Sequence, residues 1–257
     1  MISLEMQKRI LTSVFLILLL FLMFLYTYIL IISLTIIVLI SWIELYGLII
    51  KIFSKKNLIN IMLRFFCKSF SILYLISFSI LFFVLTTSSI ESKYFLIYSI
   101  LITINSDIGG LIFGKIFKGR KLTKISPKKT VSGSIGSFMF SLALVPFFLQ
   151  YFININIISI IVITLSISLA AQVGDLFISF LKRKAKVKDT GDLLPGHGGF
   201  LDRIDGLLFA IPIGFLLWQL AYTEIFFEKK LWPDFKKKDY KKLLNRFKSL
   251  KRNFGAV

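Results

Sequence analysis

The sequence predicts an all-α fold, a polytopic integral membrane bundle of about seven transmembrane helices. Hydrophobic residues make up 56% of the 257 residues, and the mean hydropathy is +0.83. Both values exceed what the core of a soluble protein of this length requires. The apolar residues also form continuous runs instead of the alternating pattern of a membrane β-barrel. Because a helix pairs its backbone N–H and C=O groups within its own segment, continuous apolar runs predict spanning helices.

The apolar segments can be assigned to seven spanning helices, each of which takes ~20 residues. Residues 10–50 can form two spans, because only Glu44 and a turn expected between Tyr26 and Tyr28 interrupt them. No small-residue cleavage site follows the first run, so a removed signal peptide is not expected. The other five spans are expected at residues 70–85, 94–113, 131–151, 157–177 and 207–227.

Basic segments alternate with pairs of spans along the chain. They are the N-terminus with Lys8 and Arg9, and residues 51–68, 115–129 and 182–203. With seven spans, all four segments lie on one side of the membrane, which the positive-inside rule assigns to the cytoplasm. The last two segments are therefore expected to share a face, as a site for a soluble ligand requires.

A basic tail, residues 228–257, is expected to follow a transmembrane domain, residues 1–227. The tail holds eleven lysines and arginines, although a seventh span would place it on the side opposite the basic loops. Its apolar residues recur at helical spacing, which predicts an amphipathic helix on an anionic membrane surface. A solvated extension is the alternative. The apolar positions are Tyr240, Leu243, Leu244, Phe247, Leu250 and Phe254.

Acidic and basic residues are concentrated in residues 179–206, which hold four acids and six bases. Asp202 and Asp205 lie three residues apart, on one face of a helix that begins there. Asp175 and Asp189 supply further carboxylates nearby. Carboxylates with few histidines suit a hard cation such as Mg²⁺, and protein-bound Mg²⁺ usually also contacts substrate phosphates. The segment therefore predicts a metal site whose neighbouring lysines and arginines hold phosphates.

Asp107 is a further candidate metal ligand, because ionisable groups inside membrane spans are rare and usually functional. Its alternative role is a hydrogen bond in helix packing. Two small-residue motifs occur close to it, Gly110-x3-Gly114 and Ser132-x3-Gly136. Such motifs let transmembrane backbones approach closely, so packing is their expected role.

Ser126 and Pro127 form the pattern of a helix N-cap followed by proline at the first helical position. Lys128 and Lys129 would then lie in the first turn, where cations oppose the helix dipole. A phosphate bound by the free N–H groups and both lysines would remove this conflict. The alternative is that the two lysines only anchor the helix at the membrane surface.

His197 is the only histidine, which excludes a histidine-rich zinc site. Because Gly196, Gly198 and Gly199 flank it, backbone can approach a ligand closely there. It is expected to contact a phosphate or a base, with a structural histidine as the alternative. Cys67 is the only cysteine, so the chain has no internal disulfide and no cysteine-based metal site.

Two blocks of the sequence resemble the phosphatidate cytidylyltransferases, also called CDP-diacylglycerol synthases. The stronger is Ser179-x-Leu181-Lys182-Arg183-x4-Lys188-Asp189-x-Gly191-x2-Leu194-Pro195-x-His197-Gly198-Gly199-Phe200-x-Asp202-Arg203-Ile204-Asp205. The upstream block comprises Asp107, Gly110-x3-Gly114-Lys115, Ile125-Ser126-Pro127-Lys128-Lys129-Thr130 and Gly133, and Trp42-x-Glu44 fits more weakly. The resemblance covers most of residues 10–222. One departure is Ser132, where the family usually carries Glu.

The resemblance implies an enzyme that makes CDP-diacylglycerol and pyrophosphate from CTP and phosphatidate. It implies Mg²⁺ as cofactor, with room for a second cation, and active-site loops in the cytoplasm. Expected partners are CTP, phosphatidate in the bilayer and an anionic lipid surface, with no nucleic acid. Whether the protein forms a homo-oligomer is left open. The expected catalytic residues are Asp175, Asp189, Asp202 and Asp205, and the expected metal ligands are Asp107, Asp175, Asp202 and Asp205. Expected substrate-binding residues are Ser126, Lys128, Lys129, Lys182, Arg183, Lys188, His197 and Arg203.

Two other function classes stay open on the sequence. The first is a CTP-dependent kinase or cytidylyltransferase of another lipid, such as a polyprenol. The second is a cation-coupled transporter, which the absence of paired broken helices in two matching halves disfavours. The chain lacks a Walker-A motif and the Asp-Gly-x2-Ala-Arg start of the CDP-alcohol phosphotransferases. It is therefore expected to make the activated lipid and not to consume it.

Overall fold

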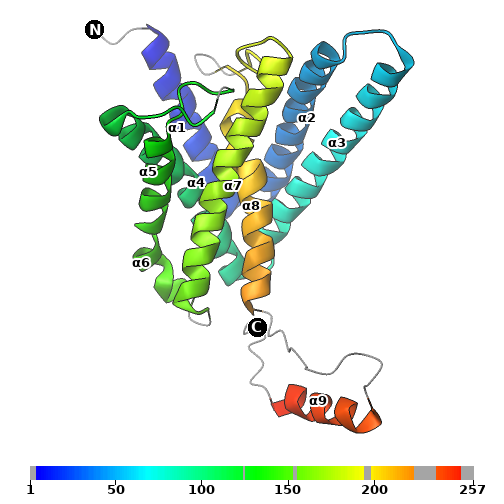
Figure 1. The fold of residues 1–257 in the computed structure, drawn as a ribbon, viewed down its shortest axis with the longest axis vertical. Coiled ribbons are helices and arrows are strands. Elements are labelled where there is room, and N and C mark those ends of the chain that lie inside the picture. Colours follow the sequence, from blue (N-terminus) through cyan, green and yellow to red (C-terminus); the bar gives the residue numbers. More distant parts are fainter. Residues whose placement is uncertain (1–3, 124, 153–154, 194–197, 223–235, 250–257) are drawn as a thin grey trace.

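Long helices run side by side from one end of the molecule to the other in the computed structural model (Figure 1). The structure describes residues 4–123, 125–152, 155–193, 198–222 and 236–249. Within these residues, seven helical segments are long and apolar enough to cross a membrane, which confirms the predicted all-α membrane bundle. The elements are α1 (Leu4–Leu25), α2 (Thr27–Ile52), α3 (Leu58–Thr87), α4 (Ile90–Phe117), α5 (Val131–Leu142), α6 (Val145–Phe148), η1 (Leu149–Tyr151), α7 (Ile157–Lys184), α8 (Leu201–Tyr222) and α9 (Lys237–Ser249).

The helix boundaries follow local signals in the sequence. Tyr26 has extended backbone angles, φ −123° and ψ 114°, and separates α1 from α2 at the predicted turn. The third span begins at Leu58, earlier than the predicted residue 70, because the Asn57 side chain accepts a hydrogen bond from the N–H of Asn60 and caps α3. Residues 58–69 therefore belong to a helix and not to the basic connection.

The fifth and seventh spans also differ from the prediction in their limits. The fifth span is divided, because α5 ends at Leu142 and α6 restarts with Pro146 in its first turn. The helix α8 begins at Leu201 instead of residue 207, with the carboxylate of Asp202 in its first turn, where the helix dipole favours an anion. Residues 223–227 of the predicted last span lie outside the described residues.

Glycines allow α4 and α5 to pack with their backbones in contact. A Cβ atom on Gly109 would lie 2.4 Å from the carbonyl oxygen of Gly136, and one on Gly133 would lie 2.8 Å from the carbonyl oxygen of Gly110. Gly114 faces Thr130 in the same way, with 3.2 Å to its Oγ1. The predicted packing role is confirmed for the glycines of the two motifs, Gly110, Gly114 and Gly136, because an added Cβ would crowd the neighbouring helix. Ser132 of the second motif bonds instead to the carbonyl oxygen of Lys118.

A second close crossing joins α7 to α8. A Cβ on Gly174 would lie 2.4 Å from the carbonyl oxygen of Asp205, and one on Gly206 would lie 3.4 Å from that of Ala171. The contact places the first turns of α8 against the second half of α7. Asp175, which follows Gly174, is thereby brought to the same part of the bundle as Asp205.

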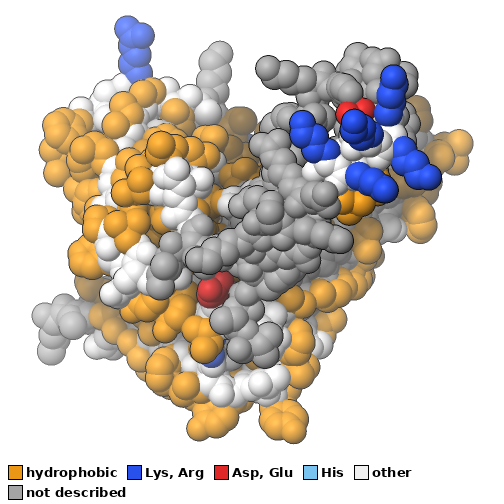
Figure 2. Space-filling model, turned by 90° about the horizontal axis from the view of Figure 1, so that it is seen from below, with side chains coloured by type: hydrophobic (Ala, Val, Ile, Leu, Met, Phe, Trp, Pro, Cys, Tyr) orange, Lys and Arg blue, Asp and Glu red, His pale blue; other side chains and the backbone are white. Residues whose placement is uncertain are grey.

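The connections from α2 to α3, from α4 to α5 and from α7 to α8 lie at the same end of the bundle as the N-terminus (Figure 1). This agrees with the predicted grouping of the four basic segments. The helix α8 ends at the opposite end, so α9 follows there. Where Figure 2 shows described residues at that end, hydrophobic side chains cover much of the surface, and the lysines of α9 are gathered to one side. The exposed lysines among the described residues there are Lys236, Lys237, Lys238, Lys241 and Lys242.

The glycine crossing can be tested by adding one methyl group. Gly109→Ala is expected to destabilise the protein by about 1–3 kcal/mol, the usual cost of overpacking a tight core, because the nearest obstacle is backbone that cannot rotate away. The matched control is Gly47→Ala on α2, where an added Cβ meets no atom within 4 Å. Thermal unfolding in detergent should show a lower Tm for Gly109→Ala alone. Equal Tm values for the two variants would contradict the crossing.

Candidate active site

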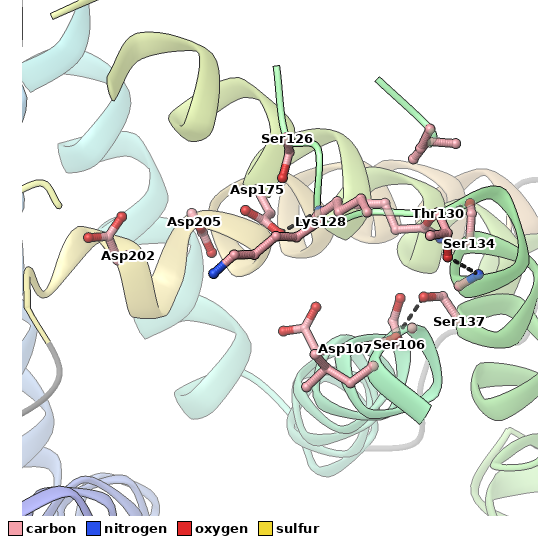
Figure 3. A pocket seen from close by; sticks show the side chains of 16 residues that line it. Ser106, Asp107, Ser126, Lys128, Thr130, Ser134, Ser137, Asp175, Asp202 and Asp205 are labelled. Atoms are coloured by element: carbon pink, nitrogen blue, oxygen red, sulfur yellow. Dashed lines mark hydrogen bonds and ion pairs between the residues drawn. The ribbon is translucent and has the colours of Figure 1, made fainter. Parts of the chain in front are cut away.

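A cavity of about 370 Å³ lies among α4, α5, α7, α8 and the loop of residues 118–130 (Figure 3). Its charged lining comes from separate parts of the chain: Asp107 on α4, Asp175 on α7, Asp202 and Asp205 on α8, and Lys128 and Lys129 on the loop. The two sequence blocks predicted to share a site therefore meet in one cavity.

The described residues of the loop, 118–123 and 125–130, form a hairpin that carries its lysines to the cavity. Lys118, with φ 49°, and Gly119, with φ 103°, turn the chain away from the end of α4. Leu122 N–H donates to the carbonyl oxygen of Lys129 at 2.8 Å, next to an antiparallel bridge between Lys121 and Thr130. The bridge holds the segment before α5 extended and leaves Lys129 directed at the cavity.

The predicted N-cap at Ser126 is wrong. The cap of α5 is Thr130, whose Oγ1 accepts from the N–H of Gly133 at 3.1 Å. Because the hairpin bridge keeps Thr130 extended, with φ −117° and ψ 158°, helical geometry begins only at Val131. Ser126 and Lys128 nevertheless line the cavity. They face it from the hairpin and not from the first turn of a helix.

Ser132, which stands where the resembling family carries Glu, closes the base of the hairpin. Its hydroxyl donates to the carbonyl oxygen of Lys118 and lies 3.1 Å from Thr130 Oγ1. The side chain does not line the cavity. In this chain the position therefore ties the end of α4 to the start of α5.

Three carboxylates face the cavity from different helices. Figure 3 shows Asp107 on α4 opposite Asp175 and Asp205, which project from α7 and α8. Lys129 Nζ forms an ion pair with Asp175 Oδ2, and Ser179 Oγ donates to Asp175 Oδ1 at 3.3 Å. Among the described residues, no three acidic, histidine or cysteine side chains converge closely enough to form a metal site as they stand.

Asp202 has a different environment from the other acids. Its Oδ1 accepts from Lys182 Nζ at 2.6 Å, and its Oδ2 accepts from the backbone N–H of Thr190 at 3.0 Å. The two charged side chains are only 15% and 10% exposed. Both Asp202 and Lys182 are thus engaged with each other, and binding a metal or a phosphate would replace these contacts. Their predicted ligand and substrate roles stay predictions.

The remaining predicted residues lie away from the cavity or outside the described part. Asp189, Lys188 and Arg183 are exposed on the loop end of the bundle, and neither they nor Arg203 line the cavity. His197 belongs to residues 194–197, which lie outside the described residues. The structure therefore brings together the hairpin lysines and Asp107, Asp175 and Asp205, and leaves these other assignments as predictions.

Small polar residues of α5 and its N-cap build part of the cavity wall and were not predicted from the sequence. Ser134 Oγ donates to Gln172 Oε1, which joins α5 to α7. Ser137 Oγ donates to the carbonyl oxygen of Ser106 at 2.7 Å and joins α5 to α4. Ser134 and Ser137 line the cavity from one face of α5, and Thr130 lines it from the N-cap position before that helix. Their i, i+4, i+7 spacing within an apolar span was the signal that could have identified them.

The pairing of Lys182 with Asp202 predicts a strong thermodynamic coupling. Lys182→Met and Asp202→Asn are each expected to cost about 3 kcal/mol, the lower end of the range for breaking a buried ion pair, because the remaining charge stays buried without its partner. The double variant should lose much less than the sum, since it leaves neither charge. Thermal unfolding of all four proteins completes the cycle. Strictly additive losses would show that the pair is not coupled.

About half of the chain is similar in sequence to known proteins. The chain is 43% identical over 126 residues to the phosphatidate cytidylyltransferase of Staphylococcus aureus (strain COL), and the aligned region is 48% of each chain. It is 40% identical over 126 residues, again 48% of each chain, to that of Staphylococcus haemolyticus. The match thus spans about half the length of these curated relatives.

Two family models match different parts of the chain. The model of a putative undecaprenyl diphosphate synthase matches residues 213–255. This region comprises the end of α8 and most of the basic tail, so the tail is similar to a segment of another protein class. The model of the cytidylyltransferase family matches residues 1–221, which include the entire cavity. The chain therefore belongs to the cytidylyltransferase family.

Proposed function

We propose that this protein is a membrane nucleotidyltransferase that converts CTP and phosphatidate into CDP-diacylglycerol and pyrophosphate. The observation that carries the proposal is the single cavity in which hairpin lysines meet carboxylates from three membrane helices. Membership of the cytidylyltransferase family and the names of the staphylococcal relatives support the choice of nucleotide and lipid. The alternatives, a kinase of another lipid and a transporter, have no comparable support.

The reaction joins two anions and needs no general base. A phosphate oxygen of phosphatidate forms a bond to the α-phosphorus of CTP, and the bond from that phosphorus to the oxygen leading to the β-phosphorus breaks. The nucleophile is already ionised at neutral pH, and the electron pair leaves with pyrophosphate. What the site must supply is positioning and positive charge.

The hairpin supplies positive charge at the cavity. Lys128 and Lys129 line it from one side, with the hydroxyls of Ser126 and Thr130 beside them. Lys129 is held ready by Asp175 in the ion pair. A triphosphate that accepts hydrogen bonds from Lys129 would compete with Asp175 and would release that carboxylate for a cation.

Asp107, Asp175 and Asp205 are the residues that would hold Mg²⁺, with a second cation as a further component. Carboxylate oxygens are the donors that this ion prefers, and Mg²⁺ is commonly bound by one or two carboxylates together with substrate phosphates. Incomplete convergence of the three acids is consistent with a site whose remaining ligands arrive with the substrate. When bound, the ion would neutralise charge on the phosphates and on the leaving pyrophosphate.

The cavity also suits a lipid substrate in its location. It is walled by membrane-spanning helices and lies at the end where the basic segments gather (Figures 1 and 3). A phosphate head group at the bilayer surface could reach it while the acyl chains stay in lipid. We assign this end to the cytoplasm by the positive-inside rule, where CTP is available.

The proposal predicts Mg²⁺-dependent transfer of label from α-³²P CTP into lipid when phosphatidate is added. Asp205→Asn should lower kcat at least ~100-fold, because it removes a negative donor from the cation site, and EDTA should abolish turnover. The control is Asp192→Asn, which changes an exposed acid of the loop between α7 and α8 that does not line the cavity. Turnover with a polyprenol and none with phosphatidate would redirect the assignment to the other lipid class.

Lys129 is predicted to act mainly on the nucleotide. Lys129→Gln should raise the KM for CTP about tenfold or more, as expected for loss of a charge-assisted hydrogen bond worth about 1.5–3 kcal/mol. Lys121→Gln is the matched control, because Lys121 lies on the same hairpin but does not line the cavity. Steady-state kinetics at saturating phosphatidate separates the two. An unchanged KM in Lys129→Gln would remove this lysine from the nucleotide site.

A further inference from the structure

Glu44 is a buried carboxylate that bonds to the loop between α7 and α8. It lies on α2 and is 6% exposed. Its Oε1 accepts from the N–H of Phe200 at 2.8 Å, and its Oε2 accepts from the N–H of Leu201 at 2.9 Å. These N–H groups begin α8 and have no partner within that helix. Glu44 therefore caps α8 from another helix, and its charge is favourable at the positive end of the helix dipole.

The loop fits closely around this carboxylate. A Cβ on Gly191 would lie 2.8 Å from Glu44 Oε1, and a Cβ on Gly199 would lie 2.8 Å from Oε2. A Cβ added to Gly199 would also overlap Thr190 Oγ1, at 1.8 Å, so no larger residue fits at this position. The glycines at these two positions thus permit close approach to Glu44. A single side chain on α2 fixes both the middle and the end of the loop.

Thr190 extends the contact from Glu44 to Asp202. Its Oγ1 lies 2.7 Å from Glu44 Oε2 and 3.1 Å from Asp202 Oδ2, so its one proton can serve either carboxylate. Asp202 in turn pairs with Lys182 on α7. The resulting network, defined as Glu44, Thr190, Asp202 and Lys182, connects α2, the loop, α8 and α7.

The network lies next to the cavity, and Glu44 itself does not line it. Asp205 is one helical turn after the capped residue Leu201, so the position of the first turn of α8 decides where its carboxylate points. Any axial shift of α8 would move Asp205 relative to Asp107 and Asp175. We propose that Glu44 is a positioning residue for the reaction, holding the start of α8 so that Asp205 faces the other carboxylates. This inference rests on the proposed function for its catalytic part.

The chemistry of the contact requires a carboxylate of this length. Three donors converge on Glu44, two N–H groups and one hydroxyl, and only an ionised carboxylate accepts all of them on both oxygens. Glutamine would turn an NH₂ group toward one N–H donor. Aspartate would keep the charge but would be one methylene too short to reach both N–H groups from the same backbone position.

The test compares Glu44→Gln with wild type by two independent measurements. We expect kcat for CTP and phosphatidate to fall about 100-fold, which is the size of effect seen when a residue that orients a ligand is lost or a catalytic group is displaced by about 1 Å. The KM for CTP should stay within about threefold. Hydrogen exchange should become faster at the amides of residues 190–193 and 198–202. Glu91→Gln is the control, because Glu91 lies in the first turn of α4 at the opposite end of the bundle.

A second pair of variants covers the case in which Glu44→Gln does not fold. Thr190→Val removes the hydroxyl but keeps the shape and the backbone bonds, and kcat is expected to fall about tenfold. Thr190→Ser keeps the hydroxyl and should restore most of the activity. Equal kcat for Thr190→Val and Thr190→Ser would overturn the network.

The outcomes separate this inference from the proposed function. Unchanged kcat in Glu44→Gln, or unchanged exchange at the start of α8, would overturn the positioning role. A wild type without turnover on CTP and phosphatidate would instead refute the proposed function. In that case the exchange comparison still decides whether Glu44 anchors α8, since it needs no substrate.

Discussion

The close crossing of α7 and α8 at Gly174 is the contact on which the site depends. Because Gly174 has no Cβ, the backbone of α8 approaches to a distance at which any side chain would collide with the carbonyl oxygen of Asp205. The next residue, Asp175, then faces the same cavity as Asp205. Two carboxylates on separate helices are difficult to hold together because they repel one another. The backbone contact supplies the constraint that side-chain attraction cannot.

A second glycine crossing, between α4 and α5, completes the cavity in the same way. Lipid chains are as apolar as leucine, so membrane helices associate through close packing and hydrogen bonds and not through burial of apolar area. Ser137 donates to the carbonyl oxygen of Ser106, and Ser106 Oγ lies 3.0 Å from Ser168 Oγ. These small residues link α5, α4 and α7 and leave space for a polar cavity inside an apolar bundle.

Two of the carboxylates that line the cavity are held in ion pairs with lysines. Lys129 pairs with Asp175, and Lys182 pairs with Asp202. A buried charge without a partner is costly, so pairing keeps the substrate-free protein stable. The two pairs differ in what they offer a ligand. Asp175 faces the cavity and can exchange Lys129 for a cation, whereas Asp202 is also bound to Thr190 and belongs to the network that orients α8.

The sequence by itself determined the all-α membrane fold, the seven spans and the grouping of basic segments at one end. It also determined that Asp202 and Asp205 lie on one face of the same helix. It also identified the glycine motifs as packing contacts and the hairpin lysines as neighbours of the acids. These features depend on local composition and spacing, because a helix forms its hydrogen bonds within a few residues and enters lipid according to its own hydropathy.

Only the tertiary structure decided which charges meet. Glu44 and Thr190 are 146 residues apart, and neither spacing nor composition indicates that they touch. The bridge between Lys121 and Thr130, which moved the start of α5 away from Ser126, likewise depends on two separate parts of the loop meeting. Contacts of this kind are set by where whole helices cross. A side chain on one helix selects its partner only after the glycine crossings have fixed the distances between backbones.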